Sequence, residues 1–173
     1  FHPCQILADF MTIKEKKKTL KGLKIAWIGD GNNVCNSMIY GAALSGAKMS
    51  IATLKGFEPD KSTVKVSQNL TDIELTTDPL KAAKNADVIV TDTYSSIHNN
   101  DSKRTKKFIP KYQVNDKIMD LAKKNAIFLH CLPAKRDQEV TSSVIDGPQS
   151  VVWDEAENRL HTQKALLCAL LHA

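Results

Sequence analysis

Polar side chains follow three of the predicted strands, and together they could bind an amino acid. A carboxylate, a hydroxyl and an amide can hold its α-ammonium and α-carboxylate groups, and a thiol beside them can face its reacting end. The sequence offers no complete triad of nucleophile, base and orienting group, so any rate acceleration would have to come from positioning and electrostatics. The side chains are Asn32 and Asn33 after the first strand, Asp92 and Ser96 after the fourth, and His130 and Cys131 after the fifth.

The segment 127–134 (Ile-Phe-Leu-His-Cys-Leu-Pro-Ala) indicates a short buried strand that runs into a polar turn. Open α/β sheets bind ligands beyond the carboxyl ends of their strands, which is where His130 and Cys131 stand. The alternative is structural, because free cysteine is among the most buried residue types and His130 could be a hydrogen-bonded core histidine. The other polar residues, taken singly, also fit caps and turns. Their gathering at three strand ends favours a site.

A glycine turn raises the alternative of a nicotinamide-dependent oxidoreductase. The segment 29–33 (Gly-Asp-Gly-Asn-Asn) lies between a strand and a helix, as a dinucleotide fingerprint would. Val34, however, stands where the third glycine is needed. The second strand ends at 50–53 (Ser-Ile-Ala-Thr) with no acid to hold a ribose hydroxyl. Both requirements fail, which disfavours NAD or FAD binding.

The elements that must position these residues alternate between strand and helix. Apolar periodicity predicts strands over 23–28, 48–53, 74–76, 87–91 and 126–129, with a short edge strand over 150–153. It predicts helices over 3–13, 34–44, 62–69, 79–85, 111–124, 138–143 and 155–171, a lysine-rich surface link after the first helix, and a long polar loop over 97–110. Such alternation predicts an α/β fold, a Rossmann-like parallel sheet with helices on both faces.

The bulk composition excludes several classes of protein. The chain has 173 residues, 42% hydrophobic and 25% charged, which fits a globular domain. Its net charge of +5 comes largely from lysine-rich runs at 14–18 and 103–107, which lack interleaved aromatic residues, so we expect no nucleic-acid partner. Four widely spaced cysteines without a CxxC pair favour reduced thiols over a disulfide framework or zinc site. No apolar run approaches the ~20 residues that span a bilayer, so we expect no membrane contact.

Five motifs lie along the chain: His-Pro-Cys-Gln at 2–5, Gly-Asp-Gly-Asn-Asn at 29–33, Thr-Asp-Thr at 91–93, His-Cys-Leu-Pro at 130–133 and Asp-Glu-Ala-Glu-Asn-Arg at 154–159. In this order they resemble ornithine carbamoyltransferases over nearly the whole chain. The first and fourth motifs are specific, because aspartate carbamoyltransferases resemble the chain less at both. The chain resembles the ornithine-binding half of such an enzyme plus its C-terminal helix.

The resemblance implies a carbamoyl-phosphate site. His2 and Gln5 would hold the carbamoyl group, and Arg159 would help to bind the same substrate. Cys131 would be the catalytic cysteine near the reacting δ-amine, and the backbone of Cys131 and Leu132 would touch the carbamoyl oxygen. The implied reaction is attack of the neutral δ-amine on the carbamoyl carbon, which gives citrulline and phosphate.

The resemblance also implies an ornithine site. Asn33, Asp92 and Ser96 would grip the amino-acid end of L-ornithine, with a backbone contact from Ile97. The family's Ser-Met-Gly loop is Ser-Ile-His at 96–98 here. This departure motivates an alternative, a divergent non-catalytic domain that binds an amino acid or only a partner subunit. Putrescine- and lysine-type relatives differ at the same loop, so the amine stays open.

The resemblance finally implies a larger assembly. The family's phosphate-binding Ser-Thr-Arg-Thr motif lies in an N-terminal domain and is absent here, and the chain opens without an initiator Met or signal peptide. We expect a fragment that is inactive alone, with a linker helix from that domain at 1–20, the ornithine-binding domain at 21–153 and a helix returning toward it at 154–173. The family implies a homotrimer with active sites at subunit borders and neither metal nor organic cofactor. The expected location is the cytoplasm, or the mitochondrial matrix in an animal.

Overall fold

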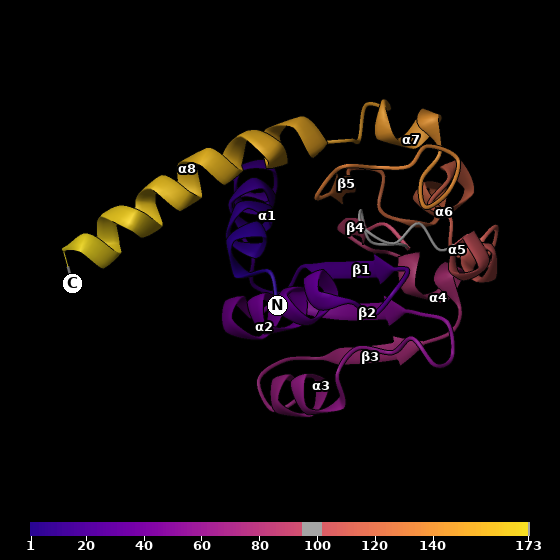
Figure 1. Ribbon diagram of the computed structural model, residues 1–173, viewed down its shortest axis with the longest axis horizontal. Coiled ribbons are helices and arrows are strands. Elements are labelled where there is room, and N and C mark those ends of the chain that lie inside the picture. The colour runs from indigo at the N-terminus through magenta and orange to yellow at the C-terminus, as the bar shows by residue number, and fades with distance from the viewer. Residues whose placement is uncertain (95–101, 173) are drawn as a thin grey trace.

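The computed structural model describes residues 1–94 and 102–172, and a parallel sheet forms its centre. Its strands lie in the order β3-β2-β1-β4-β5, every neighbouring pair is parallel, and helices cover both faces (Figure 1). The predicted Rossmann-like α/β fold is therefore confirmed. The strands are β1 Lys24–Ile28, β2 Lys48–Ala52, β3 Ile73–Thr76, β4 Val88–Thr91 and β5 Ile127–His130.

Several helices begin or end where the sequence provides a cap residue. α2 ends at Gly46, which adopts the left-handed conformation with φ 72° as expected of a C-cap glycine. α4 begins at Pro79 directly after its N-cap Asp78. The helices are α1 Pro3–Lys17, α2 Asn33–Ser45, α3 Lys61–Ser67, α4 Pro79–Ala83, α5 Ser102–Phe108, α6 Asp116–Leu121, α7 Ser142–Ile145 and α8 Val152–Leu171.

Alternate residues of β1 belong to two hydrophobic cores, one on each face of the sheet. Ile25 and Trp27 belong to the core that includes residues of α1, α2 and α3. Ala26 and Ile28 belong to the core that includes residues of α4, α5, α6 and α7. Side chains alternate across a strand, so a strand covered on both faces carries an uninterrupted apolar run. This run is what made β1 recognisable in the sequence.

The chain order reverses between β1 and β4, which lie side by side at the centre of the sheet. In open α/β sheets such a reversal opens a crevice at the carboxyl ends of the two strands, and ligands bind there. Asn32 follows β1 and Asp92 follows β4. The topology therefore brings two of the polar strand ends to one crevice.

The prediction of a loop over 97–110 is wrong in its described part, because α5 occupies Ser102–Phe108. Phe108 is fully buried and stacks on Tyr94 with ring centroids 4.5 Å apart, and it forms an edge-to-face pair with Phe57 with centroids 5.0 Å apart. Phe108 is the aromatic residue that holds this short helix against the core. One apolar residue cannot produce the 3.6-residue repeat from which a helix is predicted.

Two predicted helices are also misplaced. The helix predicted over 111–124 is confined to α6, because the buried Tyr112 hydroxyl donates to backbone carbonyls elsewhere and Asn115 caps the helix only afterwards. The helix predicted over 138–143 is displaced, because Val140 forms parallel bridges with Val114 and Arg136, and α7 begins only at Ser142.

The predicted edge strand over 150–153 is wrong. Ser150 forms a single bridge with Phe128, and α8 begins at Val152. The lysine run after the first helix is likewise no link, because α1 continues to Lys17 and ends at Lys18 with φ 66°. Propensity and charge are weak guides at such helix ends.

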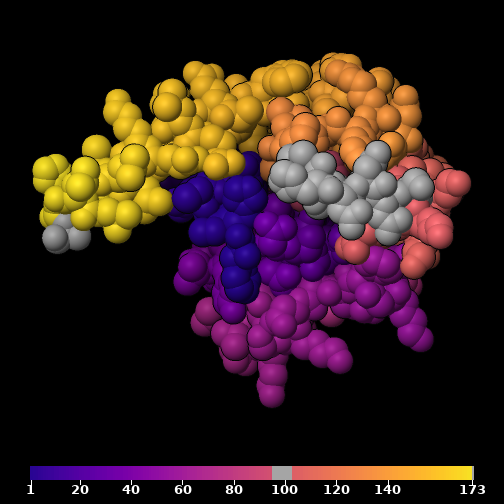
Figure 2. All heavy atoms as spheres, viewed as in Figure 1, coloured from indigo at the N-terminus to yellow at the C-terminus, as the bar shows by residue number. Residues whose placement is uncertain are grey.

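α1 and α8 pack against each other beside the sheet (Figure 1). Asn158 of α8 donates through Nδ2 to Thr12 Oγ1 of α1 at 2.9 Å. The C-terminal half of α8 projects beyond the body (Figure 2), where Leu167, Leu170 and Leu171 are 60%, 65% and 80% exposed. Within residues 1–94 and 102–172, no helix combines the length and apolar character needed to cross a membrane.

Candidate active site

Asn32 and Asp92 meet at the carboxyl ends of β1 and β4. Asn32 caps α2, because its Oδ1 accepts the backbone N–H groups of Val34 and Cys35, each at 3.0 Å. Its Nδ2 donates to Asp92 Oδ2 at 2.7 Å. Asn33, the predicted ornithine ligand, is the exposed first residue of α2. The cap residue therefore fixes Asp92, and Asn33 beside it is exposed.

The glycine turn before α2 packs against the protein's own backbone. A Cβ at Gly31 would lie 2.2 Å from Pro59 N and 2.6 Å from the Phe57 carbonyl oxygen. The Gly31 N–H donates to that carbonyl at 2.8 Å. The segment 57–59 thus covers the turn that a dinucleotide pyrophosphate would have to approach. This packing weighs further against the oxidoreductase alternative.

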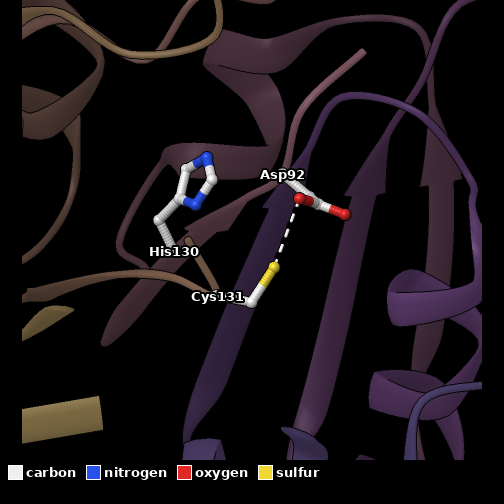
Figure 3. A group of neighbouring side chains, drawn as sticks. All are labelled: Asp92, His130 and Cys131. Atoms are coloured by element: carbon white, nitrogen blue, oxygen red, sulfur yellow. Dashed lines mark hydrogen bonds between the residues drawn. The ribbon is translucent and has the colours of Figure 1, made fainter. Parts of the chain in front are cut away.

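Cys131 lies beside Asp92, as Figure 3 shows. Its Sγ donates to Asp92 Oδ1 at 3.2 Å, and the same oxygen accepts the Thr93 N–H at 2.7 Å. Burial raises the pKa of the Cys131 thiol far above its usual range, and the charge of Asp92 raises it further. The thiol is therefore protonated, which suits a hydrogen-bond donor and not a thiolate nucleophile.

The ring of His130 is a fully buried part of the turn. Its Nδ1 accepts the Leu132 N–H at 2.9 Å, and its Nε2 lies 3.1 Å from Glu139 Oε1. Nδ1 therefore has no proton, and Nε2 donates to the carboxylate. Leu132 takes the left-handed conformation with φ 55°, which a residue with a Cβ adopts reluctantly. The buried, hydrogen-bonded imidazole of His130 thus fits the structural alternative, whereas Cys131 is only partly buried and packs against the core beside Asp92.

Asp92, His130 and Cys131 each offer a metal-ligand atom, and these atoms lie within 4.8 Å of one another (Figure 3). Both ring nitrogens of His130 are engaged, one by Leu132 and one by Glu139. Only a carboxylate and a thiol then remain for a cation. A structural zinc site takes four ligands and a catalytic one three, so these residues do not fit a zinc ion.

A second group of polar residues lies between α1 and α8. Arg159 donates through Nη1 to Gln5 Oε1 at 2.6 Å and through Nε to Gln163 at 2.8 Å. The backbone N–H of His2 donates to Ser37 Oγ at 2.7 Å. Burial and the charge of Arg159 lower the pKa of the His2 imidazole. Gln5 and Arg159, predicted to bind one substrate, are therefore in direct contact.

Two acids complete this group, and neither was predicted as a site residue. Gln5 Nε2 donates to Asp9 Oδ1 at 2.8 Å and to Glu155 Oε1 at 3.1 Å. Glu155 Oε2 accepts the His130 N–H at 2.9 Å. Glu155 therefore links the helix pair to the end of β5, one residue before Cys131. The available signals were the spacing of Gln5 and Asp9, four residues apart on one helix face, and the place of Glu155 in the motif at 154–159.

The predicted residues Ser96 and Ile97 lie outside the described residues. The chain is described again from α5, where Arg104 forms an ion pair with Asp30 after β1. The guanidinium of Arg104 also lies 4.7 Å from the centroid of the Phe57 ring. α5 is therefore tied to the same edge of the sheet as Asn32.

Residues 21–170 match the family model described as aspartate/ornithine carbamoyltransferase, Asp/Orn binding domain. The chain belongs to this family. Among its relatives, the ornithine carbamoyltransferase of Cenarchaeum symbiosum is 62% identical over 170 residues, which are 98% of this chain and 56% of that protein. The ornithine carbamoyltransferase of Methanococcus aeolicus is 52% identical over 95% of this chain and 57% of its own length.

Solved structures of the carbamoyltransferase family share the fold. Ornithine carbamoyltransferase from Pyrococcus furiosus superposes with a TM-score of 0.91 at 50% identity, over 96% of this chain and 55% of that one. The enzyme from Thermus thermophilus superposes with a TM-score of 0.89 at 44% identity, over 98% of this chain and 55% of that one. The chain thus spans somewhat more than half the length of these relatives.

Proposed function

We propose that this chain forms the ornithine-binding half of an ornithine carbamoyltransferase. Such an enzyme transfers the carbamoyl group of carbamoyl phosphate to the δ-amine of L-ornithine and yields citrulline and phosphate. The observation that carries the proposal is the Asn32–Asp92–Cys131 contact at the crevice of the sheet, in a chain 62% identical to a protein named ornithine carbamoyltransferase.

In this proposal the amino-acid end of ornithine binds at the crevice. The Asp92 carboxylate attracts the α-ammonium group, and the Nδ2 hydrogen bond from Asn32 holds that carboxylate in place. Asn33, exposed at the start of α2, is suited to an α-carboxylate, because a helix N-terminus favours an anion. Ser96 and Ile97 complete the expected contacts.

The δ-amine must then reach the carbamoyl carbon in its neutral form. The sulfur of Cys131, whose hydrogen is donated to Asp92, can accept an N–H of the amine and so direct its lone pair, which is a contribution to positioning and not to covalent catalysis. The backbone N–H of Leu132 is already donated to His130 Nδ1. In this proposal Leu132 therefore contacts the substrate through its backbone carbonyl oxygen. That oxygen suits the carbamoyl NH₂, and the Cys131 N–H suits the carbamoyl oxygen.

Carbamoyl phosphate would bind toward α1 and α8, where Gln5 and Arg159 touch each other and His2 lies within range of the Arg159 charge. The relatives are longer than this chain, which supports a further, phosphate-binding domain in the working enzyme. The apolar end of α8 is suited to packing against that domain. Assembly as a homotrimer, and a cytoplasmic location or the mitochondrial matrix in an animal, stay predictions.

A chimera tests the proposal. Residues 1–173 are joined to the N-terminal part of the ornithine carbamoyltransferase of Pyrococcus horikoshii, which is 51% identical over the shared region. The chimera should form citrulline from L-ornithine and carbamoyl phosphate, while the 173-residue chain alone should not. Lysine and putrescine in place of ornithine test the choice of amine. A folded chimera that binds ornithine in calorimetry but forms no citrulline would favour the non-catalytic alternative.

A further inference from the structure

Two buried acids from opposite ends of the chain meet at Gln5. Asp9 lies one helical turn after Gln5 on α1, Glu155 lies in the first turn of α8, and all three residues are 1% exposed. One oxygen of each carboxyl group accepts from the same Gln5 Nε2 atom, at 2.8 Å and 3.1 Å, so the two acids lie close together. Two buried carboxylates this close repel each other, and burial raises the pKa of both, so at least one of the pair is protonated.

The charges around the pair favour one proton and not two. Arg159 of α8 is hydrogen-bonded to Gln5, and its positive charge lowers the pKa of Asp9, while the negative charge of Asp92 at the end of β4 raises it. A pair that holds one proton carries a single negative charge, which Arg159 balances. Burial raises the pKa of both acids, because a second buried negative charge would have no partner.

The singly protonated pair determines which way the Gln5 amide faces. Asp9 Oδ1 and Glu155 Oε1 both accept from Gln5 Nε2, at 2.8 Å and 3.1 Å. The amide oxygen is thereby directed at Arg159 Nη1, 2.6 Å away. A flipped amide would set its oxygen against carboxyl oxygens and its NH₂ group against a guanidinium. Glu155 also holds the His130 N–H, so the same acid ties the turn of Cys131 to this group.

We propose that Asp9 and Glu155 share one proton and act as positioning residues, which fix Gln5 and Arg159 for carbamoyl phosphate. This inference rests on the proposed function, since it names the substrate that these two residues would meet. Neither acid contacts substrate. Their effect passes through the orientation of the Gln5 amide and through the backbone at the end of β5.

The pairing itself is measured on the 173-residue chain, independently of catalysis. Carboxyl ¹³C NMR over pH should give two separate titration steps shared by Asp9 and Glu155, and Asp9→Asn should merge them into one step at Glu155. Independent titration of the two acids near the values of exposed carboxyls would overturn the inference.

The positioning role is measured on the citrulline-forming chimera with matched variants. In Asp9→Asn the amide can donate to Glu155 and accept from Gln5, as a protonated Asp9 does, so the KM for carbamoyl phosphate should stay within about threefold. In Glu155→Gln one of two acceptor oxygens becomes a donor, so this KM should rise about tenfold or more while the KM for ornithine changes less. Glu157→Gln, the same replacement at an exposed position of α8, is the control and should have no effect.

The outcomes separate the two proposals. If the chimera forms no citrulline but the shared titration is found, the proposed function fails and the proton-sharing pair stands. If the chimera is active and Glu155→Gln leaves the KM for carbamoyl phosphate unchanged, the positioning role is refuted. A tenfold loss in Asp9→Asn would refute the shared proton, because that variant keeps the single negative charge.

Discussion

Cys131 donates its thiol hydrogen to Asp92 Oδ1 over 3.2 Å, and this contact limits what the cysteine can do. Burial is the main reason why its pKa is raised, and the charge of Asp92 and the hydrogen bond add to it. A thiol kept protonated donates a hydrogen bond more readily than it attacks carbon. The contact therefore makes Cys131 a directing group beside the amine, held in one orientation by the acid.

The first prediction concerns the reactivity of this thiol. Iodoacetamide at pH 8 should modify Cys131 much more slowly than the exposed Cys168, because alkylation requires the thiolate. Asp92→Asn removes a negative charge that raises the pKa of Cys131, so modification should become faster. A fall of one pKa unit corresponds to roughly tenfold more thiolate. Mass spectrometry of each peptide over time gives both rates.

Cys168 is the internal control for that experiment, because it lies on the projecting part of α8 and its rate should be the same in both proteins. Equal rates at Cys131 and Cys168 in the unmodified sequence would show that the thiol of Cys131 is not held protonated. An unchanged Cys131 rate in Asp92→Asn would remove Asp92 as the cause.

The second prediction concerns Glu139 and the turn after β5. Glu139 Oε1 accepts from both His130 Nε2 and the Lys135 N–H, while Oε2 finds no hydrogen-bond partner within residues 1–94 and 102–172. Glu139→Ala should lower the free energy of unfolding by about 2–4 kcal/mol, because it leaves buried donors unpaired. Glu139→Gln keeps one acceptor oxygen and should cost no more than about 1 kcal/mol. Urea denaturation measures both, and equal losses would contradict this account.

Much of the fold was predictable, because each strand of the sheet is a short apolar run between polar turns. β1 and β5 are buried on both faces, and their composition alone distinguishes them from an amphipathic helix. α5 was missed because Phe108 is its main apolar anchor. α7 and the start of α6 were misplaced, because Tyr112 is held by Thr53 and Val140 by Val114, both distant in the sequence.

The candidate site was predictable only in part. Asp92 and Cys131 follow adjacent strands of a parallel sheet, so topology predicts their contact. The group around Gln5 was not predictable from spacing, because Glu155 and Arg159 come from a helix about 150 positions later. The family resemblance predicted that Gln5 and Arg159, near opposite ends of the chain, bind the same substrate. Physical reasoning on the sequence did not predict this.

The third prediction concerns Gly31 and the approach to the crevice. Gly31→Ala would set a Cβ against backbone atoms of Pro59 and Phe57, which cannot move aside as a flexible side chain can. We expect a loss of about 3 kcal/mol in the free energy of unfolding. Gly56→Ala is the matched control: its φ is 88°, but its Cβ would meet no described atom within 4 Å, so it should cost only about 1 kcal/mol. Similar losses in thermal or urea denaturation would mean that the packing of segment 57–59 on the turn is loose.

The last prediction concerns the dependence of stability on pH. Burial raises the pKa of Asp9 from an ordinary 3.8 to about 7, so between these values the native Asp9–Glu155 pair keeps one proton that the unfolded chain has lost. The free energy of unfolding should therefore fall as pH rises through this window, by about 1.4 kcal/mol per pH unit at most. The side chain introduced by Asp9→Asn cannot ionise, so the free energy of unfolding of this variant should fall less over the same pH range. The difference in stability between the variant and the unmodified sequence should therefore shift in favour of the variant as pH rises. Urea denaturation at half-unit steps between pH 4.5 and 8 measures the difference, and parallel curves would contradict the raised pKa.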